Sequence, residues 1–158
     1  MKKNAKPDLW GDLPIPGAER MPADLLREQA EALAAKTNNV LDGEVDSQRP
    51  VSSSKNVCFR FVVRAPMLEY RTSIFEVEYD AANSYPCEVR RTLAGDDDAR
   101  RGGGFKIKPQ RATTELELAD MIKEILQSPE VRKLIAGLWG ASLVTEEPKP
   151  RAGAFGAF

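Results

Sequence analysis

Residues 57–93 read VCFRFVVRAPMLEYRTSIFEVEYDAANSYPCEVRRTL, and they carry the clearest structural pattern in the chain. From Val57 to Val63 apolar residues occupy every second position, and the intervening and following positions include Arg60 and Arg64. This period of two predicts a β-strand with one face on a core and an arginine-bearing face toward water.

Two further extended runs follow the first. Turn-like segments at 65–69 and 81–84 precede the runs at 70–79 and 85–93, which are rich in aromatic and β-branched residues. Together the three runs predict an antiparallel meander, and such a sheet must bury one face against other elements.

The second run has apolar residues on both of its faces. Phe75 and Val77 share one face, whereas Ile74 shares the other with Glu76 and Glu78. We therefore expect this strand to be central and partly covered on each side.

A helix is predicted before the meander. It begins after Met21, because Pro22 suits a first helical turn, and it ends at Asn38. A short strand at 40–45 is expected next, weakened or bulged at Gly43.

Two start signals predict a pair of helices after the meander. Thr114 and Glu117 have the spacing of a capping box, and Ser128 followed by Pro129 is a second N-terminal signal. Gly140 is expected to end the second of these helices.

These elements define an α+β fold class. The expected architecture is an N-terminal helix, a three- to four-stranded antiparallel meander, and two C-terminal helices packed on the sheet. We expect a flexible N-terminal arm at 1–21, a single domain at 22–143 with a flexible loop at 94–111, and a flexible C-terminal tail at 144–158.

Composition excludes several classes of function. The 158 residues include 23 basic and 24 acidic side chains, and this near-neutral balance argues against a dedicated nucleic-acid-binding protein. The chain has no histidine, so histidine-based catalytic triads and histidine-ligated metal sites are impossible. No run of apolar residues is long enough to cross a membrane, and no signal peptide is recognisable, so a cytoplasmic protein is expected.

The two cysteines fit that compartment as ordinary thiols. Cys58 and Cys87 match no zinc-binding spacing, and Cys87 is expected to pack as a small apolar side chain. We therefore predict no catalytic residue, no metal and no cofactor.

The segment 94–111 has two features that suggest ligands. Asp96 to Asp98 are consecutive carboxylates, but a calcium loop places its ligands at alternate positions. Arg100 and Arg101 precede three glycines, but a phosphate-binding loop needs a strand before it and a helix after it. A solvated loop with compensating charges is the expected structure.

Arginines define the one candidate anion or nucleic-acid site. Its residues are Arg60, Arg64, Arg90, Arg91, Arg100 and Arg101. Convergence of these side chains on one sheet surface would allow phosphate binding. The alternative, which we favour, is cross-strand pairing with Glu76, Glu78 and Glu88.

The two ends of the chain contain isolated apolar residues. The island at 10–14 is either a strap on the surface of the domain or a short motif offered to a partner. As the strap, it would bury Trp10 against the domain; as the motif, it would expose Trp10 to water. The candidate partner-binding residues are Trp10, Leu13, Phe155 and Phe158.

The order of elements, with Tyr85-Pro86 after the third extended strand, resembles the RWD and ubiquitin-conjugating (E2-like) arrangement. The resemblance covers about 22–138. Cys87 follows Pro86 directly, no cysteine lies further on, and the chain has no histidine. The resemblance thus implies the non-catalytic, RWD-type branch, which binds other proteins. Separately, residues 22–30 are similar to the openings of small uncharacterised bacterial proteins, which implies no function.

The sequence therefore predicts a non-enzymatic, cytosolic protein-interaction or adaptor module with a protein partner. Binding of nucleic acid or a nucleotide through the arginines is the alternative. A third hypothesis, an enzyme that uses Cys87 as its nucleophile, is the least favoured.

Overall fold

The computed structural model describes residues 7–13, 20–93 and 108–146. Its elements, in chain order, are α1 (Pro22–Lys36), β1 (Asp42–Gln48), β2 (Asn56–Ala65), the 3-10 turn η1 (Pro66–Leu68), β3 (Tyr70–Asp80), β4 (Asn83–Arg91), β5 (Gln110–Ala112), α3 (Glu115–Leu126) and α4 (Pro129–Glu146). The predicted α+β class, with one N-terminal helix, an antiparallel meander and two C-terminal helices, is confirmed.

The sheet contains five strands in the order β1-β2-β3-β4-β5, and each neighbouring pair is antiparallel. The strand beyond the expected three to four is β5, which pairs with β4 through Cys87–Ala112, Glu88–Arg111 and Val89–Gln110. It begins at Gln110, inside the range that was expected to be an irregular loop. The rest of that loop, 94–107, lies outside the described residues.

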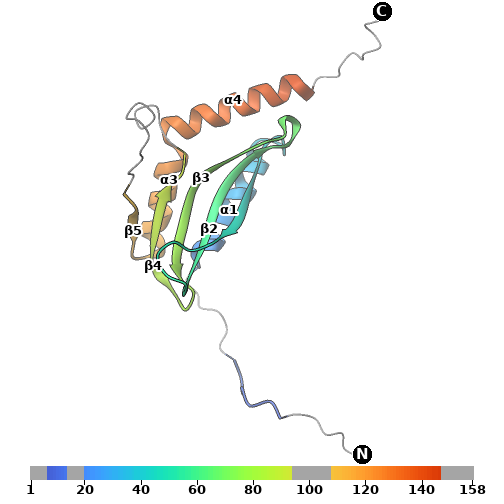
Figure 1. Cartoon of the computed structure of the whole chain (residues 1–158). Coiled ribbons are helices and arrows are strands. Elements are labelled where there is room, and N and C mark those ends of the chain that lie inside the picture. Colours follow the sequence, from blue (N-terminus) through green and yellow to red (C-terminus); the bar gives the residue numbers. More distant parts are fainter. Residues whose placement is uncertain (1–6, 14–19, 94–107, 147–158) are drawn as a thin grey trace, which may run out of the picture.

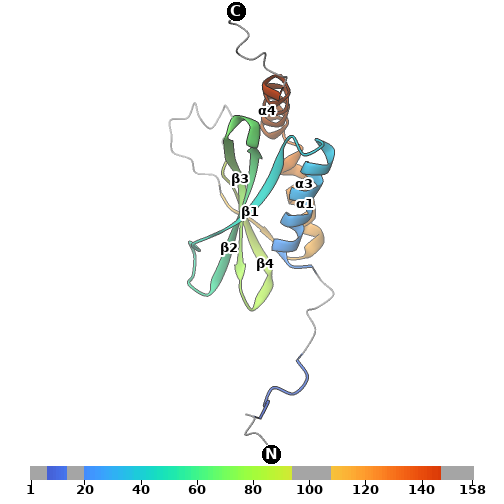
Figure 2. The ribbon, with the colours of Figure 1, turned by 90° about the vertical axis from the view of Figure 1, so that its right-hand side faces the viewer.

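The helices lie on one side of the sheet and at one end of it. Figures 1 and 2 show α1 and α3 side by side over the same face of the sheet. In Figure 1, α4 runs across the end of the sheet, where it contacts η1 and β2. The opposite face of the sheet has no helix over it among the described elements.

The core lies between the sheet and these helices. Phe61 on β2 and Phe75 on β3 are fully buried, and their rings stack with centroids 5.3 Å apart. Leu26 of α1 and Leu118 of α3 are buried in the same cluster. At about 1.5–3 kcal/mol for each fully buried large apolar side chain, these contacts dominate the stability of the domain.

A β-bulge corrects the predicted position of Ile74. The β2–β3 register shifts between Phe61 and Val62, so Ile74 has no partner on β2. The extra residue lets both Ile74 and its neighbour Phe75 join the core cluster. Strict alternation had placed Ile74 on the other face with the glutamates, because a period of two assumes a continuous ladder.

Gly43 allows α1 to lie close to the sheet. A Cβ atom at this position would come 2.7 Å from both Cα and Cβ of Ala30. The register of β1 against β2 is continuous from Asp42 to Gln48, so the expected bulge at Gly43 is absent. The glycine is therefore explained by helix–strand contact.

The predicted helix starts are present, but one helix end was placed wrongly. The Thr114 hydroxyl accepts the backbone N–H of Glu117 at 3.1 Å, as the capping pattern predicts. The Glu117 carboxylate reaches one residue further back, to the backbone N–H of Thr113. Gly140 does not end α4, which continues to Glu146. One exposed glycine costs a helix only about 1 kcal/mol, which is less than the burial of a large apolar side chain such as Leu138 on the same helix contributes.

Candidate functional site

Arginine and carboxylate side chains alternate across the helix-free face of the sheet. Arg60 donates to Glu76 from Nε at 3.0 Å and from Nη2 at 2.7 Å. Arg64 makes a two-pronged contact with Asp42, at 2.7 and 2.9 Å. Arg71 donates from Nη2 to two carboxylates of β1, that of Glu44 at 2.9 Å and that of Asp46 at 2.7 Å. Each of these guanidinium groups is therefore paired with a carboxylate of the sheet.

Arg90 is the centre of this charge network. It donates to Glu78 at 2.8 Å and lies 3.5 Å from a carboxylate oxygen of Glu76 and 3.7 Å from one of Glu88. The pairing with Glu76, Glu78 and Glu88 that we favoured from the sequence is present. The three carboxylates outnumber Arg60 and Arg90, so both guanidinium groups are already paired within the sheet.

Arg91 does not join this surface. Arg91 follows Arg90 on the same strand, so its side chain points to the opposite face, and it lies across from Phe75 in the β3–β4 register. It makes no ion pair with another described residue. Arg100 and Arg101 lie outside the described residues. Among the described candidate arginines, Arg60, Arg64 and Arg90 lie on this face, and each of them pairs with a carboxylate.

Glu78 is the most buried charged side chain of this face, with 1% of the side chain exposed. Its carboxylate accepts hydrogen bonds from the backbone N–H groups of Val51 and Ser52, from Asn56 and from Arg90. Burial by itself would raise the pKa of Glu78, but these donors outweigh it and lower the pKa to about 2. The carboxylate therefore fixes the connection between β1 and β2 to the sheet.

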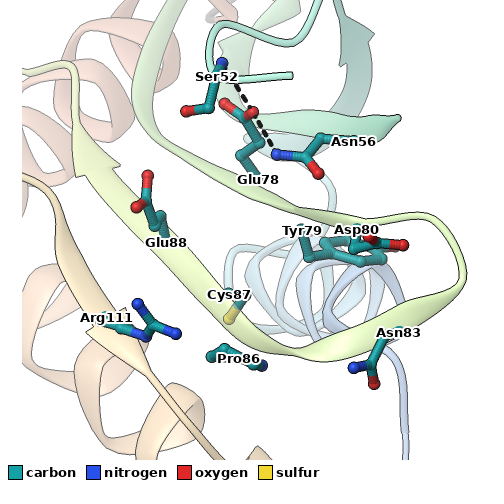
Figure 3. Close-up of a pocket in the computed structure, with 10 residues that line it drawn as sticks. All are labelled: Ser52, Asn56, Glu78, Tyr79, Asp80, Asn83, Pro86, Cys87, Glu88 and Arg111. Carbon is teal, nitrogen blue, oxygen red and sulfur yellow. Dashed lines mark hydrogen bonds between the residues drawn. The ribbon is translucent and has the colours of Figure 1, made fainter. Parts of the chain in front are cut away.

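A polar cavity of about 280 Å³ lies beside Glu78 (Figure 3). It is lined by Ser52, Asn56, Glu78, Tyr79, Asp80, Asn83, Pro86, Cys87, Glu88 and Arg111. Figure 3 shows that the Glu78 side chain points toward Ser52 and Asn56, where its hydrogen bonds are used. The described residues contain no group of three or more potential ligands that could hold a metal ion.

The two thiols do not supply a nucleophile to this cavity. Cys87 is buried, and burial, with a smaller effect of the Glu88 charge, raises its pKa to about 12. Burial also raises the pKa of the Cys58 thiol, with a further contribution from the charge of Glu76. A reactive cysteine needs a lowered pKa and access to solvent, and neither thiol has them.

The N-terminal segment 8–13, hereafter the arm motif, is the most exposed apolar part of the described chain. The exposed fractions are 88% for Leu9, 77% for Trp10 and 62% for Leu13. The Trp10 backbone N–H donates to Asp8 at 3.0 Å, and Gly11 has a φ of +68°, so the segment forms a local turn. The strap interpretation is wrong for Trp10, because its side chain lies in water.

Arg20 attaches the arm to the domain. Its guanidinium binds Glu28 of α1 and Glu115 of α3, and its backbone N–H donates to Glu115 at 3.1 Å. The Tyr85 hydroxyl donates to the Arg20 carbonyl at 2.8 Å. This cluster, hereafter the Arg20 clamp, joins α1, β4 and α3. Sequence patterns did not predict this cluster, because Tyr85 and Glu115 are 65 and 95 positions away from Arg20.

The other predicted partner-binding residues, Phe155 and Phe158, lie outside the described residues. No helix in the described ranges has the length and apolarity required to cross a membrane. No protein-family model, no curated protein and no solved structure matches the chain.

Proposed function

We propose that the protein is a non-enzymatic, cytosolic protein-interaction module that binds its partner through the arm motif. The observation that carries this proposal is the exposure of Trp10, at 77%, between two exposed leucines. Tryptophan is one of the three residue types, with tyrosine and arginine, that are enriched among side chains that dominate binding energies. An exposed tryptophan in a short turn has much apolar surface to bury on a partner.

The charges of the arm motif define the chemistry of the partner. Asp8 and Asp12 flank Trp10, and the motif contains no basic residue. A complementary partner surface would have an apolar pocket for Trp10 and Leu13 and basic side chains at its rim. Binding of this kind weakens moderately as salt rises, because rim charges are screened while the apolar contact is not.

Three observations support a non-enzymatic module. The chain has no histidine. Both thiols are buried with raised pKa values. The buried carboxylate Glu78 is fully occupied by donors that fold the β1–β2 connection. The RWD-type resemblance noted above is compatible with this proposal, since that branch binds proteins without catalysis.

Nucleic-acid or nucleotide binding is the less favoured function. Phosphate recognition requires guanidinium groups that are free to bind phosphate oxygens. Arg60, Arg64 and Arg90 instead bind carboxylates of the sheet itself.

The proposal is tested by retention of lysate proteins on the immobilised full-length chain. Trp10→Ala and Leu13→Ala should each abolish retention of a specific protein. The matched control is Leu116→Ala, which removes an aliphatic side chain that is also exposed, at 71%, but lies on α3. Retention that survives Trp10→Ala, or is lost equally in Leu116→Ala, would contradict the arm motif as the binding element.

A further inference from the structure

The two edge strands of the described sheet differ in how they are protected. β5 has only three residues and follows Pro109, whereas β1 has seven residues and contains neither proline nor lysine. The register between β1 and β2 is continuous, so no bulge twists the β1 edge away. Short length, proline, lysine and bulges are devices that keep an edge strand from pairing with another chain. β1 has none of these four devices.

The outer side of β1 is open to an added strand. In an antiparallel pair every second residue directs its N–H and C=O away from the neighbouring strand. Among the described residues, β1 pairs with β2 alone, and no backbone–backbone hydrogen bond reaches residues 42–48 from outside the sheet. Figure 2 views the sheet edge-on from the side of β1, with the other strands behind it. The outward backbone groups of β1 are therefore available to another chain.

A groove of about 340 Å³ lies at this edge, between β1 and α1. Ala30 and Ala34 of α1 line it together with residues from both faces of β1, so it is placed beside the free backbone edge. The small side chains of these alanines leave room for side chains of an added strand. Glu31 stands at the rim of the groove, is exposed, and makes no ion pair with another described residue. An added strand would direct every second side chain into this groove.

The charges of β1 determine which strand fits. Three carboxylates alternate along it and share the helix-free face: Asp42, Glu44 and Asp46. Arg64 pairs with the first of them, and the one guanidinium group of Arg71 serves the other two. Arg60, which faces Asp46 in the register, is paired with Glu76. Together with Glu31 across the groove, the edge therefore has an excess of negative charge.

We propose that β1 binds an extended segment of another protein in which basic side chains alternate with small or β-branched ones. The segment pairs with β1 as an additional strand, so that main-chain hydrogen bonds supply affinity and the alternate side chains supply specificity. Its basic side chains lie beside the carboxylates of β1, and the others enter the groove. A second copy of this chain does not fit, because two β1 strands would place like charges side by side. This surface is separate from the arm motif and does not rest on the proposed function.

Strand addition is tested with peptides of seven residues, the length of β1, that alternate lysine and valine. Fluorescence anisotropy of the labelled peptide with the full-length chain should show saturable binding, and a peptide with glutamate in place of lysine should show none. Two further peptides are N-methylated either at the lysine amides or at the valine amides. One of them should bind at least about tenfold more weakly than the other, because only one set of amides faces β1. Attraction by charge alone would treat both peptides alike.

Variants of the chain locate the binding surface. Glu31→Lys should weaken binding of the lysine–valine peptide about threefold or more, because it reverses the charge at the rim of the groove. Glu124→Lys makes the same change of net charge at an exposed site on α3 and should leave the dissociation constant within about twofold. Trp10→Ala should also leave it unchanged, so that failure of this inference and failure of the arm motif are distinguishable. Amide chemical-shift changes on addition of the peptide should be largest at residues 42–48.

Four results would overturn the proposal. They are absence of binding by the lysine–valine peptide, equal affinities of the two N-methylated peptides, equal effects of Glu31→Lys and Glu124→Lys, and chemical-shift changes centred away from β1. A loss of peptide binding in Trp10→Ala would also contradict it, since the peptide would then bind through the arm motif.

Discussion

The carboxylate of Glu78 is removed from water by the connection between β1 and β2, yet it accepts four hydrogen bonds in return. Such a group stabilises the fold only while it is ionised. The folded-state pKa of Glu78, about 2, lies below the ordinary value of 4.5. Its stabilisation is therefore fully present above the ordinary value and is lost as the pH falls toward 2.

Acid titration of stability should reveal this group. Between about pH 4.5 and about pH 2 the chain should lose about 3 kcal/mol of unfolding free energy because of Glu78 alone. In Glu78→Gln the free energy of unfolding should fall by about 3 kcal/mol less over this pH range. Urea unfolding at a series of pH values measures the difference. Glu124→Gln, at an exposed site on α3, should keep the slope of the unmodified chain. An unchanged slope in Glu78→Gln would contradict the assignment.

The close contact between Gly43 and α1 can be tested by substitution of this one residue. Gly43→Ala would force a methyl group to within 2.7 Å of the Ala30 backbone, and α1 would have to move. We expect a loss of about 1–3 kcal/mol, the usual cost of overpacking. Ser47→Ala, at an exposed position of the same strand, should change the free energy of unfolding by less than about 0.5 kcal/mol. Equal urea midpoints for the two variants would show that the close contact does not constrain the fold.

Among the substitutions considered, truncation of one ring of the stacked pair Phe61 and Phe75 should lower the free energy of unfolding most. Phe61→Ala should cost about 3–5 kcal/mol, because truncation removes buried apolar surface and leaves a cavity. The control is Phe59→Ala, on the same strand but only partly buried, which should cost less. A urea-derived loss below about 1 kcal/mol for Phe61→Ala would be incompatible with this core.

Among the elements, α3 depends on a cap that the sequence already indicated. Thr114→Ala removes the acceptor for the Glu117 N–H and should cost about 0.5–2 kcal/mol. Thr145→Ala, in the last turn of α4, removes only a hydroxyl that donates to the carbonyl of Ala141, so its effect should stay below about 0.5 kcal/mol. Thermal unfolding of the two variants measures the difference, and equal melting temperatures would exclude a capping role.

The elements were predictable to the extent that local patterns determine them. The alternation from Val57 to Val63 and the capping residues of α3 are short-range signals, and they gave the meander and the helix starts. The bulge at Ile74 and the strand β5 depend on pairing with distant strands. No window of the sequence contains both partners, so periodicity alone could not place them.

The same limit applied to the candidate sites. The arginine pairs on the sheet were expected because Arg60 and Glu76 fall on facing positions of neighbouring runs. The position of Arg91 also follows from alternation, but it was grouped with Arg90 by residue type. The four donors around Glu78 and the Arg20 clamp are brought together only by the complete fold.

At the level of the whole molecule, the arm motif should be independent of the domain in stability. Deletion of residues 1–13 removes Trp10, Leu9 and Leu13, which are exposed, so the urea midpoint should be unchanged. The same deletion should abolish partner retention. With Trp139→Phe as background, emission from Trp10 should be red-shifted, as expected for an indole in water. A blue-shifted spectrum together with a lower urea midpoint would restore the strap interpretation.

The Arg20 clamp fixes the point on the domain from which the arm motif extends, so the arm motif is a tethered binding segment. Arg20 lies ten positions after Trp10, so the chain between them cannot span more than about 36 Å. A partner held by Trp10 is thereby confined to a small volume around the end of the domain where Tyr85 and Glu115 lie. Confinement of this kind corresponds to a local concentration on the order of millimolar. A second contact between that end of the domain and the partner would then be occupied most of the time if its dissociation constant were below about a millimolar. The partner would stay bound longer although the arm motif itself bound no more tightly.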